Sequence, residues 1–152
     1  MALAQALEEE IKEYHFHIYY FQNKNCPNSG WQNYAEKLQS QIQELIDSAF
    51  FKVRLKRKFD EPVGPHPLPM FEVWCPKESF NRLYSWLLLH RGPLTVLIHP
   101  LTREELKDHT ERAVFMGSPI QLDPAILRVN LDKVPLEYPE LGLGYSAPSD
   151  KQ

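Results

Sequence analysis

Cysteine and long apolar runs are scarce in this sequence, and both shortages exclude classes of protein. The 152 residues hold two cysteines, Cys26 and Cys75, and neither has a companion at the spacing of a zinc site. No apolar run approaches the roughly 20 residues that cross a bilayer, and residues 8–10 are glutamates where a signal peptide carries a basic flank. We therefore expect a cytoplasmic protein with reduced thiols and no contact with a membrane.

An excess of basic residues is also missing. The chain has 17 Lys and Arg against 20 Asp and Glu, a net charge of −3, so no nucleic-acid partner is expected. There is no nucleophile elbow, no phosphate-cradling glycine loop and no H-E-x-x-H motif. These absences remove most of the support for a hydrolase, a nucleotide-binding protein or a protease.

The remaining composition is that of an ordinary globular protein, with 43% hydrophobic and 24% charged residues. A chain of this length buries roughly two-thirds of its unfolded surface without disulfides. We expect a single domain over residues 1–152, with a core at about 12–123 and an extended C-terminal tail at about 124–152. The tail is rich in proline and glycine and has too little periodicity to assign.

Alternating apolar residues predict four strands, and apolar residues at helical spacing predict two long helices between them. The strands span residues 14–21, 51–56, 70–75 and 94–99, and the helices span about 30–48 and 76–91. Ser29 with Gln32 has the spacing of a capping box at the start of the first helix. Thr102 with Glu105 is spaced in the same way and predicts a short helix through about Arg112.

The order strand, helix, strand, strand, helix, strand predicts an α+β fold, the ferredoxin-like βαββαβ unit with a four-stranded antiparallel sheet. Within it, we expect the first and third strands to lie parallel and adjacent in the middle, with the fourth antiparallel beside the first. The basic run 54–58 is expected to be a solvated face of an edge strand. Both long helices cover one face of the sheet. The other face is expected to be bare, so we predict a homodimer that pairs through it or through its edge.

Four histidines are predicted to meet at one end of that open face. His15 and His17 alternate on the first strand, His66 stands in a stiff proline-rich loop before the third, and His99 ends the fourth. Neutral imidazole is the commonest transition-metal ligand in proteins, so these residues are candidate ligands of one ion. Each has an ordinary explanation when taken alone, namely a wet strand face, a hydrogen bond in a loop or the cap of a strand end.

Two further residues are candidates for catalysis. Glu72 projects from the same face and can complete a two-histidine, one-carboxylate set, orient a ligating histidine, or pair with a lysine. His109 lies on the short helix that follows His99, and an imidazole with a pKa near neutrality can accept and return a proton. Its ordinary explanation is a partly buried histidine bonded to a backbone carbonyl.

Several segments together resemble one known family. The stretches 14–20, 64–67, 70–73, 99–102 and 108–110 read YHFHIYY, GPHP, MFEV, HPLT and DHT. In this order and spacing, over about residues 12–123, they resemble the DOPA 4,5-dioxygenase family. The resemblance implies a ferredoxin-like, dimeric, non-haem enzyme that opens the ring of a catechol such as L-DOPA with dioxygen. The implied cofactor is Fe(II), although zinc or another divalent metal is possible in the purified protein.

The resemblance also implies roles for the cluster. Ferrous iron held by its histidines binds the two catechol oxygens, and His109, or whichever of His15 and His17 is not a ligand, takes a proton. The side of the substrate ring can be lined by three residues that can equally pack as core, namely Tyr19, Met70 and Trp74. A substrate carboxylate can be held by one of three arginines, namely Arg91, Arg103 and Arg112.

Two positions depart from the family pattern, in which a glycine is common at the position of Arg103 and a tryptophan at that of Phe115. Both affect the expected substrate more than the expected reaction. Two rival functions remain open at this point. One is a dimeric ferredoxin-like module that binds a structural metal or a small aromatic molecule without catalysis. The other is a cofactor-free or haem-dependent monooxygenase of the same fold.

Overall fold

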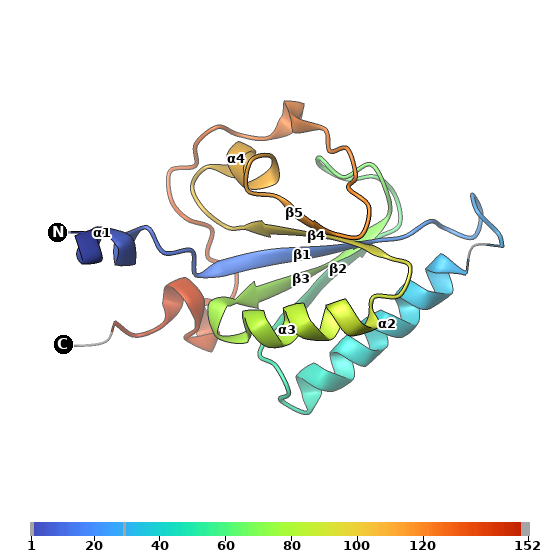
Figure 1. The fold of residues 1–152 in the computed structure, drawn as a ribbon, viewed down its shortest axis with the longest axis horizontal. Helices are drawn as coiled ribbons and strands as arrows, with labels where there is room; N and C mark the ends of the chain where they lie inside the picture. Colours follow the sequence, from blue (N-terminus) through green and yellow to red (C-terminus); the bar gives the residue numbers. More distant parts are fainter. Residues whose placement is uncertain (1, 29, 150–152) are drawn as a thin grey trace.

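The fold is seen in a computed structural model, which describes residues 2–28 and 30–149 (Figure 1). The strands are β1 (Glu13–Tyr19), β2 (Arg54–Phe59), β3 (Met70–Pro76), β4 (Thr95–Pro100) and β5 (Val114–Met116). The α-helices are α1 (Ala2–Glu8), α2 (Trp31–Asp47), α3 (Lys77–His90) and α4 (Glu105–His109), and three short 3-10 helices lie at Pro124–Ile126, Pro139–Leu141 and Gly144–Ser146. Among these described residues, no helix is long and apolar enough to cross a membrane.

The sheet is antiparallel and has five strands in the order β2-β3-β1-β4-β5. The predicted four-strand count is therefore wrong, because the short strand β5 adds to the edge beside β4. The prediction that the first and third strands run parallel is also wrong, since Glu13 pairs with Pro76 and Tyr19 with Met70. The physical reason is that a helix carries the chain from β1 to β2, and the direct return into β3 then reverses its direction.

The alternation of side chains across the sheet follows the predicted pattern. Phe16 and Ile18 of β1 and Val73 of β3 face α2 and α3, where they join one buried core. That core also contains Phe71, Val96, Ile98, Leu38, Ile42, Leu83 and Leu87. Full burial of such a side chain contributes about 1.5–3 kcal/mol to folding. Figure 1 shows both helices on this side of the sheet, so every other strand residue projects to the opposite side.

The helix ends differ from the predicted capping boxes. Ser29 lies outside the described residues, and α2 begins after Gly30, whose φ of 68° is the left-handed conformation that glycine adopts most readily. The side chain of Gln32 accepts a hydrogen bond from the backbone N–H of Asn23 instead of capping. The short helix ends at His109, three residues before the expected boundary. Its Thr102 hydroxyl accepts from the Glu104 N–H two residues on and does not reach Glu105.

The face opposite the long helices is covered, which corrects the prediction of a bare surface. Figure 1 shows α4 and residues 117–137 on that side of the sheet, whereas the last two 3-10 helices lie beside the start of α3, where Gly144 N–H donates to Glu78. Backbone hydrogen bonds hold this layer in place, from Asp123 N–H to the Pro65 carbonyl and from Leu131 N–H to the Arg103 carbonyl. Beneath it lies a small apolar cluster of Tyr19, Met70 and Leu97 with partly buried neighbours. The C-terminal segment could not be assigned from periodicity because its contacts are long-range and irregular.

Candidate metal centre

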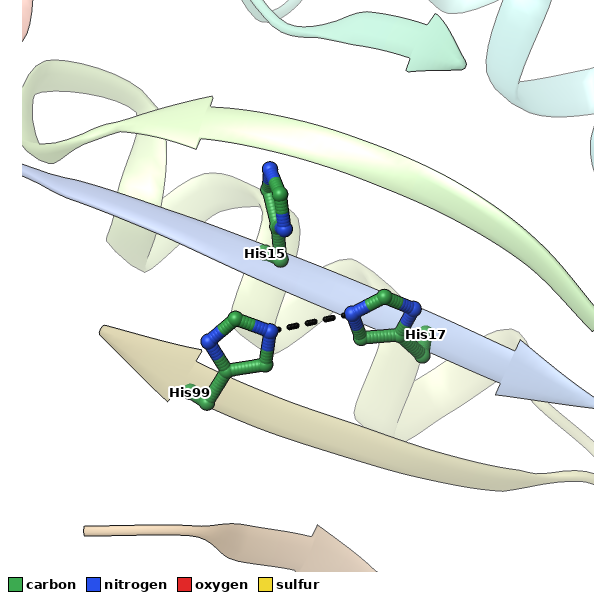
Figure 2. Close-up of side chains that lie close together, drawn as sticks. All are labelled: His15, His17 and His99. Carbon is green, nitrogen blue, oxygen red and sulfur yellow. Dashed lines mark hydrogen bonds between the residues drawn. The ribbon is translucent and has the colours of Figure 1, made fainter. Parts of the chain in front are cut away.

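Three histidines project from adjacent strands into the covered face. His15 and His17 stand two residues apart on β1, and His99 of β4 pairs directly with His15. Strands in a sheet lie about 4.8 Å apart, so side chains at paired positions on one face are neighbours. All three are buried, and Figure 2 shows their rings gathered above the two strands. The sheet itself therefore fixes the positions of these imidazoles.

The nitrogens of these rings are close enough to share one ion. One ring nitrogen from each of His15, His17 and His99 lies within 4.8 Å of the others. The Nε2 atoms of His17 and His99 are 3.0 Å apart (Figure 2). Two ligands bonded to one metal at ~2.1 Å lie roughly 3 Å apart when their bonds are perpendicular, so this spacing suits a shared ion. Nδ1–H of His99 donates to the Pro100 carbonyl at 2.9 Å, so Nε2 of His99 carries the lone pair that accepts from His17 Nε2–H or binds an ion in its place.

A second group of three histidines could also share one ion, and it consists of His17, His66 and His109. His17 therefore belongs to both groups. His66 was expected near the start of the first strand, but the start of β3 lies at the opposite end of β1. The loop reaches the cluster because a turn closes between Val63 and His66 and the chain returns over the sheet. His66 Nδ1 is hydrogen-bonded to the Tyr19 hydroxyl at 2.6 Å, and its ring centroid lies 4.1 Å from that of His17.

His109 joins the cluster from α4. Its ring centroid lies 3.9 Å from that of His99. Nδ1–H donates to the carbonyl of Glu105 one helical turn earlier, at 2.8 Å, so Nε2 carries the lone pair. The backbone hydrogen bond expected as its ordinary explanation is therefore present, and it leaves the second nitrogen able to accept a proton.

Two carboxylates bind the ring of His15. Nδ1 lies 2.8 Å from Glu72 Oε1, and Nε2 lies 2.7 Å from Glu137 Oε2. The Lys56 ammonium lies 3.4 Å from Glu72 and donates to Glu137 at 2.7 Å. Two cationic and two anionic groups thus alternate around a closed ring of contacts, so each carboxylate charge is balanced where it is buried.

Lys56 and Glu137 are absent from the set predicted from the sequence. Lys56 was assigned to a solvated strand face, but Leu55 packs into the helix-side core, and alternation places Lys56 on the face of Glu72. That signal was available in the pattern of β2. Glu137 had no such signal, because it lies in the C-terminal segment where no period relates one residue to the next.

Burial and neighbouring charges shift the pKa values of the cluster in opposite directions. Burial lowers the pKa of His17 and of His99 well below the usual value, and lowers that of His66 to about 4. Burial acts in the same sense on His15, but Glu137 and Glu72 outweigh it and raise its pKa. Burial works against ionisation of Glu72, yet His15 and Lys56 hold its pKa at about 2. Most of the imidazoles are therefore neutral, as metal binding requires.

We expect the metal-free protein to lose stability as the pH falls from about 6.5 towards 4. In that window the imidazoles of His17, His66 and His99 become protonated in the unfolded state but stay neutral in the folded state, where burial lowers their pKa values. The unfolded state therefore binds more protons. Each such histidine lowers the free energy of unfolding by about 1.4 kcal/mol per pH unit. Urea titrations of chelator-treated protein at pH 7 and pH 5 measure the difference. Equal stability at both values would contradict neutral burial of these rings.

The histidines line a cavity of about 250 Å³. It is bounded by the two carboxylates on one side and by α4 and the C-terminal segment on the other, with Thr102, Glu105, Asp108, Arg128, Leu131 and Pro135 among its walls. A cavity of this size suits a small ligand with a single ring. The donor set of several neutral imidazoles beside an anionic carboxylate fits a divalent transition metal. The site therefore combines a possible metal centre with room for a ligand beside it.

Comparisons with known proteins agree with this chemistry. The family model described as the Dopa 4,5-dioxygenase family matches residues 14–126. A curated protein of Amanita muscaria named DOPA 4,5-dioxygenase is 43% identical over 150 residues, which cover 98% of this chain and 64% of that protein. An uncharacterized 21.2 kDa protein of Botryotinia fuckeliana is 38% identical over 121 residues, covering 74% of this chain and 61% of that protein. The chain thus spans less than two-thirds of the length of these relatives.

A solved structure is similar as well. A protein from Nostoc punctiforme, provisionally described as a dioxygenase, superposes with a TM-score of 0.64 at 28% sequence identity. The match covers 80% of this chain and 93% of that one. The residues that the family model matches include all five clustered histidines, on β1, β4, α4 and the loop before β3. The chain belongs to the Dopa 4,5-dioxygenase family.

Proposed function

We propose that the protein is an extradiol dioxygenase that cleaves a catechol such as L-DOPA at a histidine-bound, non-haem Fe(II). The observation that carries this proposal is the convergence of buried imidazole nitrogens within 4.8 Å of one another. They form one wall of a cavity large enough for a single-ring ligand. Family membership supports the same reaction.

His15, His17 and His99 are the proposed ligands. Their backbone positions are held by two paired strands, whereas His66 and His109 come from a loop and a short helix. Two of them are already spaced as ligands of one ion, with Nε2 atoms 3.0 Å apart. In metal-bound histidines the second ring nitrogen typically donates to an oxygen, and the Pro100 carbonyl and Glu137 are such acceptors for His99 and His15. The other nitrogen of His15, Nδ1, faces Glu72 at 2.8 Å, so binding an ion there requires loss of the proton shared with that carboxylate. Glu72 adds a negative charge beside the ion.

The metal, when bound, supplies the one-electron chemistry that lets dioxygen react with a diol. The protein positions the substrate and moves protons. Nε2 of His109 is the proposed acceptor for a catechol hydroxyl proton, because its lone pair is free and its ring packs against that of His99. His66 is proposed to stay neutral because burial lowers its pKa to about 4, and to line the ring pocket beside the Tyr19 hydroxyl.

The proposed reaction breaks the ring bond between one hydroxyl-bearing carbon and the neighbouring carbon that carries no hydroxyl. Both oxygen atoms of one dioxygen molecule enter the product, a muconic semialdehyde, and the catechol is oxidised. No external reductant is needed, because the four electrons that reduce dioxygen come from the substrate. With L-DOPA, cleavage between ring carbons 4 and 5 gives the yellow product that cyclises to betalamic acid.

We expect chelator-treated protein to regain catechol cleavage with ferrous ion and not with zinc. Zinc has no redox chemistry, so it can occupy the imidazole site without supporting the reaction with dioxygen. The test is to add L-DOPA in air to each metal-loaded protein, and to record oxygen uptake and yellow product together. One oxygen consumed per product formed supports the proposal. Oxygen uptake without ring-opened product favours a monooxygenase, and retained zinc without turnover of any catechol favours a binding module.

Three coarser properties are proposed alongside the reaction. The strand order of β1 to β4 and the two helices on one face support a single ferredoxin-like core. A homodimer stays a prediction, now without the bare face that suggested it. A cytoplasmic location also stays a prediction.

A further inference from the structure

The rim of the histidine cavity carries an ion pair between Arg128 and Glu105. Arg128 Nε donates to Glu105 Oε2 at 3.1 Å, and both residues line the cavity. The Arg128 side chain is 73% exposed and that of Glu105 is 25% exposed, so the pair stands where the cavity meets solvent. The backbone carbonyl of Arg128 accepts from Leu106 N–H, which fastens this part of the chain to α4.

The three arginines considered from the sequence as partners of a substrate carboxylate are engaged elsewhere. Arg91 donates to the Leu94 carbonyl and Arg103 to the Leu131 carbonyl. Arg112 forms ion pairs with Glu104 and Asp108. Among the described residues, none of the three lines the histidine cavity.

Lys56, which lies beside the histidine cluster, is also paired with other groups. Lys56 contacts both Glu72 and Glu137, so its charge is already balanced within the buried ring of contacts. Arg128 differs, because its ion pair with Glu105 uses Nε, so the two terminal nitrogens take no part in that contact. A guanidinium fork of this kind matches the geometry of a carboxylate.

On the basis of the function proposed above, we propose that Arg128 and Glu105 select a catechol that carries a zwitterionic amino-acid group. The substrate carboxylate binds the guanidinium of Arg128, and its ammonium binds the carboxylate of Glu105. Glu105 and His109 are one helical turn apart, so their side chains are neighbours at about 5–6 Å. An amino-acid group a few bonds from a ring beside His109 therefore reaches this pair.

The cost of sharing the pair with a ligand is small. An exposed ion pair contributes little to stability, so substrate charges can replace part of it without a large loss. A zwitterion supplies both charges, whereas a purely anionic ligand leaves Glu105 beside its carboxylate. A purely cationic ligand meets Arg128 in the same unfavourable way. The site therefore discriminates between ligands that share one catechol ring and differ in side-group charge.

The test measures binding separately from catalysis. Zinc-loaded protein without oxygen is titrated with L-DOPA, 3-(3,4-dihydroxyphenyl)propionate, dopamine and 4-methylcatechol, and dissociation constants are read by calorimetry. Arg128→Gln is expected to weaken L-DOPA binding about tenfold, or ~1.4 kcal/mol. It should weaken the propionate similarly and leave 4-methylcatechol unchanged. Glu105→Gln is expected to weaken L-DOPA and dopamine, again with no effect on 4-methylcatechol.

Arg82→Gln is the matched control, since it removes the same charge from the exposed surface of α3, where Arg82 donates to the Phe50 carbonyl. If the Arg128 or Glu105 variant loses the same affinity for all four ligands, or loses none for L-DOPA, the proposed selection by Arg128 and Glu105 is wrong. Because the readout is affinity, this result is independent of turnover. If the wild-type protein binds L-DOPA selectively but cleaves no catechol, the result contradicts the proposed dioxygenase activity. It still supports the proposed role of Arg128 and Glu105 in binding.

Discussion

Replacing His17 with glutamine is expected to abolish both metal retention and catechol cleavage. His17 belongs to each of the two groups of histidines that could hold an ion, so no complete set survives its loss. Metal affinity should fall by more than the roughly 10–100-fold that loss of a residue supporting a ligand costs. Metal analysis of protein dialysed at neutral pH, with the L-DOPA assay on the same sample, measures both effects.

His90→Gln is the control for this variant. His90 lies at the end of α3, stacked on Trp86 and bonded to its carbonyl, on the helix side of the sheet. It should keep its full metal content and activity. A His17→Gln protein that is folded by circular dichroism and still holds one ion per chain would exclude both groups as the metal centre.

The second large effect is a separation of metal binding from turnover. His15→Gln is expected to lose the metal, because it removes a ligand, while His109→Gln is expected to keep the metal and lose turnover. Loss of a positioned acid or base lowers the rate by about 10²–10⁴-fold. Metal content and single-turnover cleavage under air distinguish the two variants.

The reverse pattern would assign the ion to His17, His66 and His109 and give His15 the proton-transfer role. A third variant makes this assignment independent of folding defects. His66→Gln should retain the metal if the ion is held by the strand histidines, and lose it if the loop histidine is a ligand. Since His66 is 6% exposed and bonded to Tyr19, the fold of this variant is checked by its urea midpoint.

Alternation along β1 was enough to place His15 and His17 on one face, opposite Phe16 and Ile18. The side-chain period of a strand is two, so this prediction needs no knowledge of the partner strand. The same reasoning placed Glu72 and His99 correctly beside them. For His66 the predicted position was right although its reason was wrong, because β3 runs antiparallel to β1 and the loop folds back over the sheet.

Local pattern therefore indicated four of the five strands, the long helices and the side of the sheet on which each strand histidine stands. Only the tertiary structure decided that Glu137 pairs with both His15 and Lys56, and that the C-terminal segment covers the face expected to be bare. The reason is physical. A strand or helix that is buried on one side has apolar residues at regular intervals in the sequence, so it can be predicted locally. An irregular segment is held by a few hydrogen bonds to distant residues, and no regular pattern in the sequence indicates them.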